Sequence, residues 1–120
     1  MLSNLYQISD FNREAGQISA RIGLNVSHPI FEGHFPGQPV LPGVCQMAIV
    51  KELVEKALQK PLRLKKADQV KFLSMIDPRK TPELILQIQL SEEAGLYTAQ
   101  AILQFEEYTF LKYKARFIDA

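Results

Sequence analysis

Apolar and polar residues alternate over several stretches of this 120-residue chain, and the alternation limits the possible fold more than any other feature. Successive side chains of a β-strand point to opposite faces, so strict alternation is typical of a strand with one buried face. The pattern is clear over residues 18–26, 84–90, 97–105 and 112–117. We also expect a longer, less regular strand over residues 64–76 and a weaker first strand over residues 2–11.

A single helix is predicted among these strands, from about Gly43 to Gln59, ending before Pro61. Its first half is apolar on nearly all sides apart from Gln46, whereas charged residues mark one side of its second half. We therefore expect the helix to begin deep in the core and to end in water. Together the elements predict an α+β fold with one domain over residues 1–120, an antiparallel sheet curled around a central helix.

Composition excludes several kinds of protein. The chain has 14 Lys and Arg residues against 13 Asp and Glu, a net charge of +1, which provides no general attraction to nucleic acid. It has no apolar run near the roughly twenty residues that cross a bilayer and no secretion signal, so we expect no membrane partner and a cytoplasmic location. The one cysteine, Cys45, excludes an internal disulfide and a zinc site built from several thiolates. No metal or other cofactor is implied.

Residues 34–44, with the sequence HFPGQPVLPGV, contain three prolines and two glycines. Such a run cannot continue a helix or a sheet, so it predicts a rigid, extended loop that holds His34 in a defined place. Pro42 and Gly43 then open the helix, and a residue without Cβ lets another group approach the backbone closely. Free N–H groups at a helix start attract an oxyanion. A base beside an oxyanion site is typical of an enzyme that removes a proton next to a carbonyl.

This run, the helix after it and residues 67–72 (ADQVKF) resemble the hotdog-fold 3-hydroxyacyl-(acyl carrier protein) dehydratases of fatty acid synthesis. The resemblance spans nearly the whole chain and implies the hotdog fold. It also implies a homodimer or a dimer of dimers with sites at the subunit interface, each taking an acyl chain on the phosphopantetheine arm of acyl carrier protein. By this resemblance, His34 removes the α proton and the Gly43 N–H binds the thioester carbonyl.

The substrate itself is expected to contact Phe35, Val44 and Phe72, although aromatic residues near a core mostly pack against one another. Arg63, Lys65 and Lys66 form a short basic cluster. The cluster either docks the acidic carrier protein or protects the edge of a strand against aggregation.

The acidic residue of this family does not carry over. In the family a carboxylate fourteen places after the histidine protonates the departing hydroxyl, and this chain has Ala48 there. Alanine cannot donate a proton, and losing a general acid typically costs a factor of about 100 to 10,000 in rate. Glu52, four residues further along the same helix face, is the candidate replacement. The alternative for Glu52 is a solvated carboxylate paired with Lys56.

Other polar residues have two interpretations each. His34 is a catalytic base or a histidine held in a turn, and we expect His28 to be structural. Cys45 is a nucleophile favoured by the helix dipole or a small buried hydrophobic residue. Gln46 needs a partner, which is either the opposite subunit or the substrate.

Two functions follow from this pattern. The first is a dehydratase acting on carrier-linked 3-hydroxyacyl chains with an atypical or absent general acid. The second is a non-catalytic acyl-binding or scaffolding homologue that pairs with an active dehydratase. The complete loop from His34 to Gly43 favours the enzyme, because a non-catalytic protein would not require that imidazole.

Overall fold

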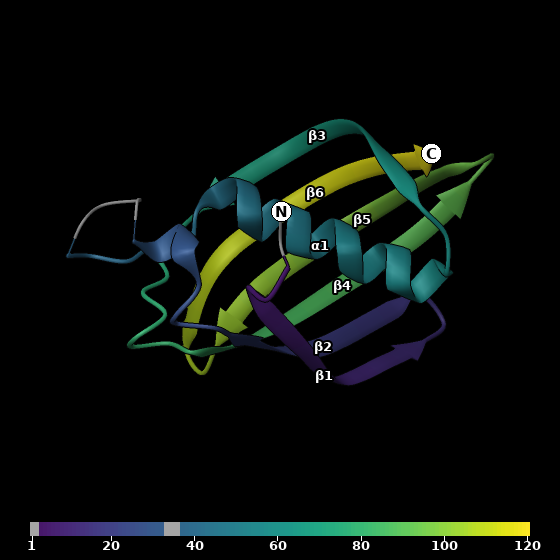
Figure 1. The fold of residues 1–120 in the computed structure, drawn as a ribbon. Helices are drawn as coiled ribbons and strands as arrows, with labels where there is room; N and C mark the ends of the chain where they lie inside the picture. The colour runs from purple at the N-terminus through teal and green to yellow at the C-terminus, as the bar shows by residue number, and fades with distance from the viewer. Residues whose placement is uncertain (1–2, 33–36) are drawn as a thin grey trace.

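The computed structural model describes residues 3–32 and 37–120, and these form a six-stranded sheet that curls around a helix (Figure 1). The strands are β1 (Tyr6–Glu14), β2 (Gln17–Leu24), β3 (Leu62–Phe72), β4 (Glu83–Glu93), β5 (Leu96–Phe105) and β6 (Tyr108–Asp119). A short 3-10 helix, η1 (Pro29–Phe31), and the helix α1 (Gly43–Leu58) lie between β2 and β3. Neighbouring strands are antiparallel in the order β1-β2-β4-β5-β6-β3. The α+β architecture predicted from the sequence is confirmed.

The core lies between α1 and the inner face of the sheet. One stripe of α1 is buried along its whole length, formed by Cys45, Gln46, Ile49, Val50, Leu53, Val54 and Ala57. The expectation that the helix begins deep and ends in water is wrong, because Val44 at its start is 68% exposed while Ala57 near its end is buried. The helix lies across the sheet, so burial follows a face of the helix rather than one half of it.

Strand β3 forms one edge of the sheet and is exposed on both faces for most of its length. It begins at Leu62 and ends at Phe72, earlier at both ends than the predicted range of 64–76. The chain beyond Phe72 turns toward the start of α1, where the Ile76 carbonyl accepts a hydrogen bond from the Leu41 N–H at 2.9 Å. Strand β1 also differs from its predicted limits, since it covers residues 6–14 rather than 2–11. Across the described parts of the chain, no helix combines the length and apolar character needed to span a membrane.

Candidate active site at the amino end of α1

The amino end of α1 presents backbone amides that the helix itself cannot bond. Pro42 precedes the helix with an extended backbone, and its carbonyl accepts from the N–H groups of Cys45 and Gln46 at 3.0 and 3.1 Å. The first amides of an α-helix, here those of Gly43 and Val44, have no intrahelical acceptor. The N-cap residue, a proline, makes no side-chain hydrogen bond to them. Such an end stabilises an oxygen on which negative charge develops.

A hollow of about 400 Å³ lies at this end of α1. Its lining comes from the loop before the helix, the first helical turns and the segment after β3, and includes Gly43, Gln46, Phe72, Leu73 and Met75. The last three side chains are all half exposed or more. The hollow therefore combines apolar walls with free amides, which is the arrangement that an apolar chain ending in a carbonyl group requires.

Gly43 and Phe72, both expected in the site from the sequence, lie against each other. A Cβ atom built on Gly43 would lie 2.6 Å from the Cζ atom of the Phe72 ring. Only a residue without a side chain lets the ring cover the helix start so closely. The close approach expected at Gly43 is therefore made, in this chain, by an aromatic side chain.

Gln46 is the buried polar residue of the site, with 3% of its surface exposed. Its Nε2 atom donates a hydrogen bond to the Leu41 carbonyl oxygen at 3.1 Å. Its Oε1 atom is buried and has no hydrogen-bond partner among residues 3–32 and 37–120. Burying an amide oxygen without a partner costs about 1–3 kcal/mol, so this oxygen is a position in the described site that lacks a donor.

The remaining expected site residues are distributed differently. His34 and Phe35 lie outside the described residues. Val44 is mostly exposed and is not part of the described lining of the hollow. Ala48, where the resemblance places a carboxylate, is half-buried and packs against the core.

Glu52 also lies outside the described lining of the hollow. It follows Gly43 by nine residues, so the helical rise places it about 13 Å further along the axis. Its carboxylate accepts a hydrogen bond from the Tyr6 hydroxyl of β1. Burial, and then this carboxylate, raise the pKa of Tyr6 well above its usual range. The partner of Glu52 is therefore Tyr6 rather than Lys56, whose Nζ lies 5.3 Å from the centroid of the Phe11 ring.

Two further residues have structural roles. The Nδ1 atom of His28 accepts from the Ile30 N–H at 3.0 Å, and its Nε2 atom lies 3.1 Å from the Ser3 carbonyl oxygen. Cys45 is 1% exposed, and burial raises the pKa of its thiol. A protonated, buried thiol fits a small packing residue and not a nucleophile.

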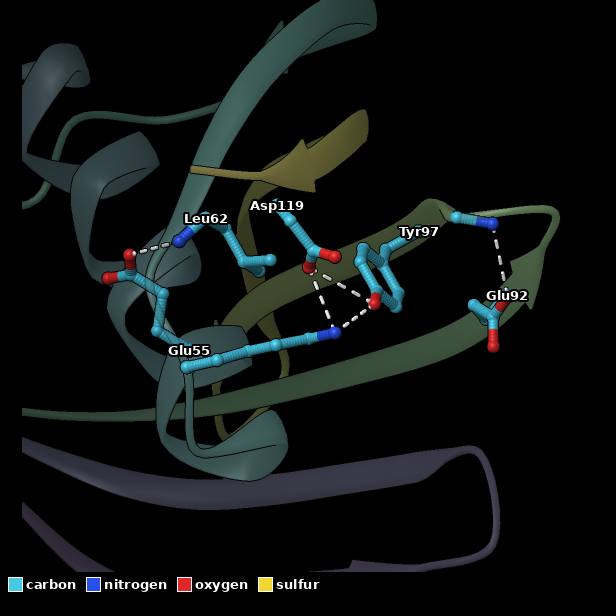
Figure 2. A network of polar contacts seen from close by, with 7 residues as sticks. Glu55, Leu62, Glu92, Tyr97 and Asp119 are labelled. Carbon is cyan, nitrogen blue, oxygen red and sulfur yellow. Dashed lines mark hydrogen bonds and ion pairs between the residues drawn. The ribbon is translucent and has the colours of Figure 1, made fainter.

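The carboxyl end of α1 is held by a polar network (Figure 2). The Nζ atom of Lys60 lies 2.9 Å from Oδ1 of Asp119 and donates to the hydroxyl of Tyr97, which donates to Asp119 at 3.2 Å. Glu55 accepts from the Leu62 N–H at 2.8 Å. Hydrogen bonds to Tyr97 and Asp119 raise the pKa of Lys60, and the bond from Lys60 lowers the pKa of Asp119. The network fixes the chain where it leaves α1 and enters β3.

A second hollow, of about 340 Å³, lies on the outer face of the sheet. Amide and ammonium side chains line much of it, including Gln87, Gln89, Gln100, Lys112 and Lys114. These polar walls suit water better than an acyl chain. The hollow at the start of α1 is therefore the candidate site.

The sequence analysis missed Leu73 and Met75 as site residues because it placed them inside the expected strand over residues 64–76, whereas β3 ends at Phe72. Their exposed fractions, 52% and 70%, show that they leave the sheet without entering the core. The available signal was Asp77-Pro78, a turn that begins two residues after Met75. It marked the end of the segment but not the departure from the sheet at Phe72.

A curled antiparallel sheet, a central helix and an amide-rich site at the helix start define a hotdog-fold protein. Residues 10–111 match the ApeI-like family, which is described as ApeI dehydratase. Because the match covers most of the chain, this protein belongs to the ApeI-like family.

Individual relatives agree with this assignment. A chain of the dehydratase heterocomplex ApeI:P from Xenorhabdus doucetiae is 25% identical, with a TM-score of 0.77, and the match covers 94% of this chain and 97% of that one. The 3-hydroxyacyl-(acyl-carrier-protein) dehydratase FabZ of Xanthomonas oryzae pv. oryzae is 27% identical over 107 residues, 79% of this chain and 69% of FabZ. FabZ of Haemophilus influenzae is 30% identical over 98 residues, 75% of this chain and 65% of its own length. The hotdog fold expected from the sequence is confirmed.

Proposed function

We propose that this protein removes water from 3-hydroxyacyl thioesters to form 2-enoyl thioesters, in fatty acid or related acyl-chain biosynthesis. The observation that carries the proposal is the free amide end at Gly43 beside an apolar hollow, in a chain of a dehydratase family. The Gly43 N–H binds the thioester carbonyl, which makes the α proton more acidic, and the neutral ring of His34 removes that proton. Phe35, Val44 and Phe72 contact the acyl chain.

Replacing His34 tests the proposal most directly. Without the base, His34→Ala should lower the rate at least about 100-fold while circular dichroism and particle size stay unchanged. The assay uses 3-hydroxyacyl and 2-enoyl thioesters on carrier protein, and hydration of the enoyl form counts equally as catalysis. His28→Ala is the matched control, because the His28 ring binds only the Ser3 carbonyl before β1 and the Ile30 N–H after β2 among the described contacts. This variant should keep its turnover. Full turnover by His34→Ala would contradict the assignment.

The departing hydroxyl needs a proton, and Ala48 supplies none. In a Glu52→Gln background, which removes the other candidate acid, we expect Ala48→Glu to raise the dehydration rate by about 100-fold or more, because a positioned general acid contributes that much. Ala48→Gln has nearly the same volume but no proton to give, so it controls for the effect of size at this half-buried position. Equal rates for the two variants would show that position 48 does not face the reacting hydroxyl.

Glu52 is the proton donor that we propose for the natural chain. It would act on the partner subunit's substrate, since it lies far along the helix from Gly43 of its own chain. Glu52→Gln keeps an oxygen that accepts from Tyr6, so a lower rate with unchanged unfolding supports the assignment. An unchanged rate excludes it.

Strand β3 is the surface along which we expect a second copy to bind. It has 11 residues, pairs on one side with β6, and has no strand on its other side among the described residues. Leu64 and Val70 are exposed on it although they are apolar. Pairing along β3 would give a homodimer, or a dimer of dimers, and light scattering measures which forms.

A different second chain is the alternative, because ApeI belongs to a dehydratase heterocomplex in Xenorhabdus doucetiae. This chain would then be an acyl-binding or scaffolding subunit, and the partner would supply the carboxylate that Ala48 lacks. Activity that appears only after mixing with an active dehydratase distinguishes this case from the homodimer.

Acyl carrier protein is the partner that we propose for docking. Strands β3 and β6 carry seven of the 14 basic side chains and two of the 13 acidic ones. Across the two strands Lys71 lies opposite Lys112, and Lys66 lies opposite Arg116. An acidic protein would associate faster with such a surface.

The cytoplasmic location expected from the sequence stays a prediction.

Charge reversal tests the docking surface. Lys112→Glu with Lys114→Glu, both on β6 and away from the proposed edge of self-association, should slow the reaction of carrier-linked substrate and leave a small N-acetylcysteamine thioester unaffected. Lys80→Glu lies outside both strands and serves as the control. Equal rates on carrier-linked substrate before and after reversal would exclude this surface.

A further inference from the structure

The side chain of Gln46 is oriented by two features of α1. Long helical side chains point back toward the amino end of their helix, and the hydrogen bond from Nε2 to the carbonyl oxygen of Leu41, five residues earlier, follows this direction. That carbonyl can only accept, so the amide nitrogen must face it and Oε1 must face the other way. The assignment of the two amide atoms is therefore determined by chemistry.

Gln46, which carries the free oxygen, lines the same hollow as Gly43. Residues three apart on a helix are neighbours on one face, and both Gly43 and Gln46 line the hollow. Gln46 is the buried polar side chain in the described core, whose other buried members are apolar. A leucine at this position would pack without an unpartnered oxygen. Retaining an amide there favours a role toward a ligand.

We infer that Gln46 positions the substrate, with its Oε1 accepting a hydrogen bond from the 3-hydroxyl of the acyl chain whose thioester carbonyl lies at the Gly43 amide. This inference rests on the proposed function. One helical turn, about 5 Å, separates the two residues, and the 3-hydroxyl of an acyl thioester lies two carbons beyond its carbonyl carbon. A carboxamide neither gives nor takes a proton at neutral pH, so Gln46 orients the hydroxyl and selects for its presence.

Binding measurements with and without the hydroxyl test the inference. The His34→Ala background should slow turnover at least about 100-fold. In this background, calorimetry measures the binding of the N-acetylcysteamine thioesters of 3-hydroxybutyrate and butyrate. Gln46→Leu should weaken binding of the hydroxylated ligand about tenfold, and leave the butyryl ligand within about twofold, because only the former loses a hydrogen bond. Gln46→Met, of similar length, should behave in the same way. Gln100→Leu on the outer face of the sheet is the matched control and should change neither value.

Four outcomes would overturn the inference. Unchanged affinity for both ligands shows that Oε1 contacts no substrate group. Equal losses for both ligands point to the amide N–H of the thioester arm, and S-ethyl thioesters, which lack that amide, identify this case when their binding is unaffected. If the His34→Ala protein with its natural Gln46 binds neither ligand, and the natural protein shows no turnover, the proposed function is refuted as well. Turnover without hydroxyl selectivity refutes only the role of Gln46.

Discussion

The two ends of α1 differ in how their backbone groups are bonded. At the carboxyl end, Arg13 donates to the Ala57 carbonyl at 2.5 Å, and the Glu55 carbonyl accepts from the two N–H groups that follow the helix. At the amino end, the N-cap side chain bonds no amide and Gln46 has an oxygen without a partner in the described chain. We call the carboxyl end of α1 the closed end, because its backbone groups are bonded, and the amino end the open end, because it has groups without a described partner.

This difference separates stability from function within one element. Bonded polar groups contribute to the folded state, whereas unbonded ones lower its stability unless something binds them. Sequences depart from full local satisfaction mainly at functional positions. The open end of α1 is thus where binding energy is available, and the closed end holds the helix that presents it.

The largest effect is expected from a substitution in the buried stripe of α1, which holds both ends of the helix against the sheet. Leu53 lies in the middle of the buried stripe of α1 with no exposed surface. Leu53→Ala should lower the free energy of unfolding by about 2–5 kcal/mol because it leaves a cavity between helix and sheet. Urea titration followed by circular dichroism measures the change. Val44→Ala, on the exposed side of the same helix, should change it by less than about 0.5 kcal/mol, and similar losses for both variants would contradict the described packing.

The next effect concerns the open end alone. In Gly43→Ala the new Cβ displaces the Phe72 ring, at a cost of about 1 kcal/mol in stability. Turnover should fall further, about 100-fold, because small displacements in a site are costly for catalysis. Phe72→Ala alone also loses its proposed contact with the acyl chain, so steady-state kinetics of both single variants and of the double variant measure the coupling. A double variant whose loss is the product of the two single losses would show that the ring contact is not the cause.

At the closed end, a smaller effect on stability is expected without an effect on catalysis. Glu55→Ala removes the acceptor of the Leu62 N–H and should cost about 1 kcal/mol. Glu55→Gln keeps an accepting oxygen and should cost less. Unfolding midpoints and turnover are measured on the same preparations. A loss of turnover in Glu55→Ala beyond the loss of folded protein would remove the distinction between the two ends.

The smallest effect depends on pH. The hydrogen bond from Lys60 lowers the pKa of Asp119 below its ordinary value of 3.8, so the folded state holds its proton less tightly than the unfolded chain. The contribution of the pair is complete above that value and is lost as the pH falls below it. Asp119→Asn should therefore lower the thermal midpoint slightly near neutral pH, and the difference should vanish in acid. Both side chains are partly exposed, so the change is small. A difference that grows in acid would have the wrong sign.

Local patterns predicted most elements of this fold. Alternation predicted β2, β4, β5 and β6 because the period of a strand is visible in adjacent residues. The start of α1 at Gly43 was also predicted from neighbouring residues, because a proline such as Pro42 suits the start of a helix. The end of β3 could not be predicted in this way. The segment after Phe72 leaves the sheet toward Leu41, whose N–H binds the carbonyl of Ile76 and which lies far earlier in the chain.

The candidate site was predictable in part. Gly43 and Phe72 were expected in it, and Gln46 stood out as a polar residue among apolar ones. The hydrogen bond from Gln46 Nε2 to the Leu41 carbonyl, which orients the amide, could not be predicted from the sequence, since it depends on the path of the loop at Leu41. The partner of Glu52 was also missed, because Tyr6 comes from a strand 46 positions away.

Four cations, Arg63, Lys65, Lys66 and Lys71, line the edge strand β3. Two copies that meet along this edge bring like charges together, and in dilute buffer the repulsion extends about 30 Å, against about 8 Å at physiological ionic strength. Added salt should therefore strengthen the self-association of this protein. Assemblies held by opposite charges respond to salt in the reverse direction.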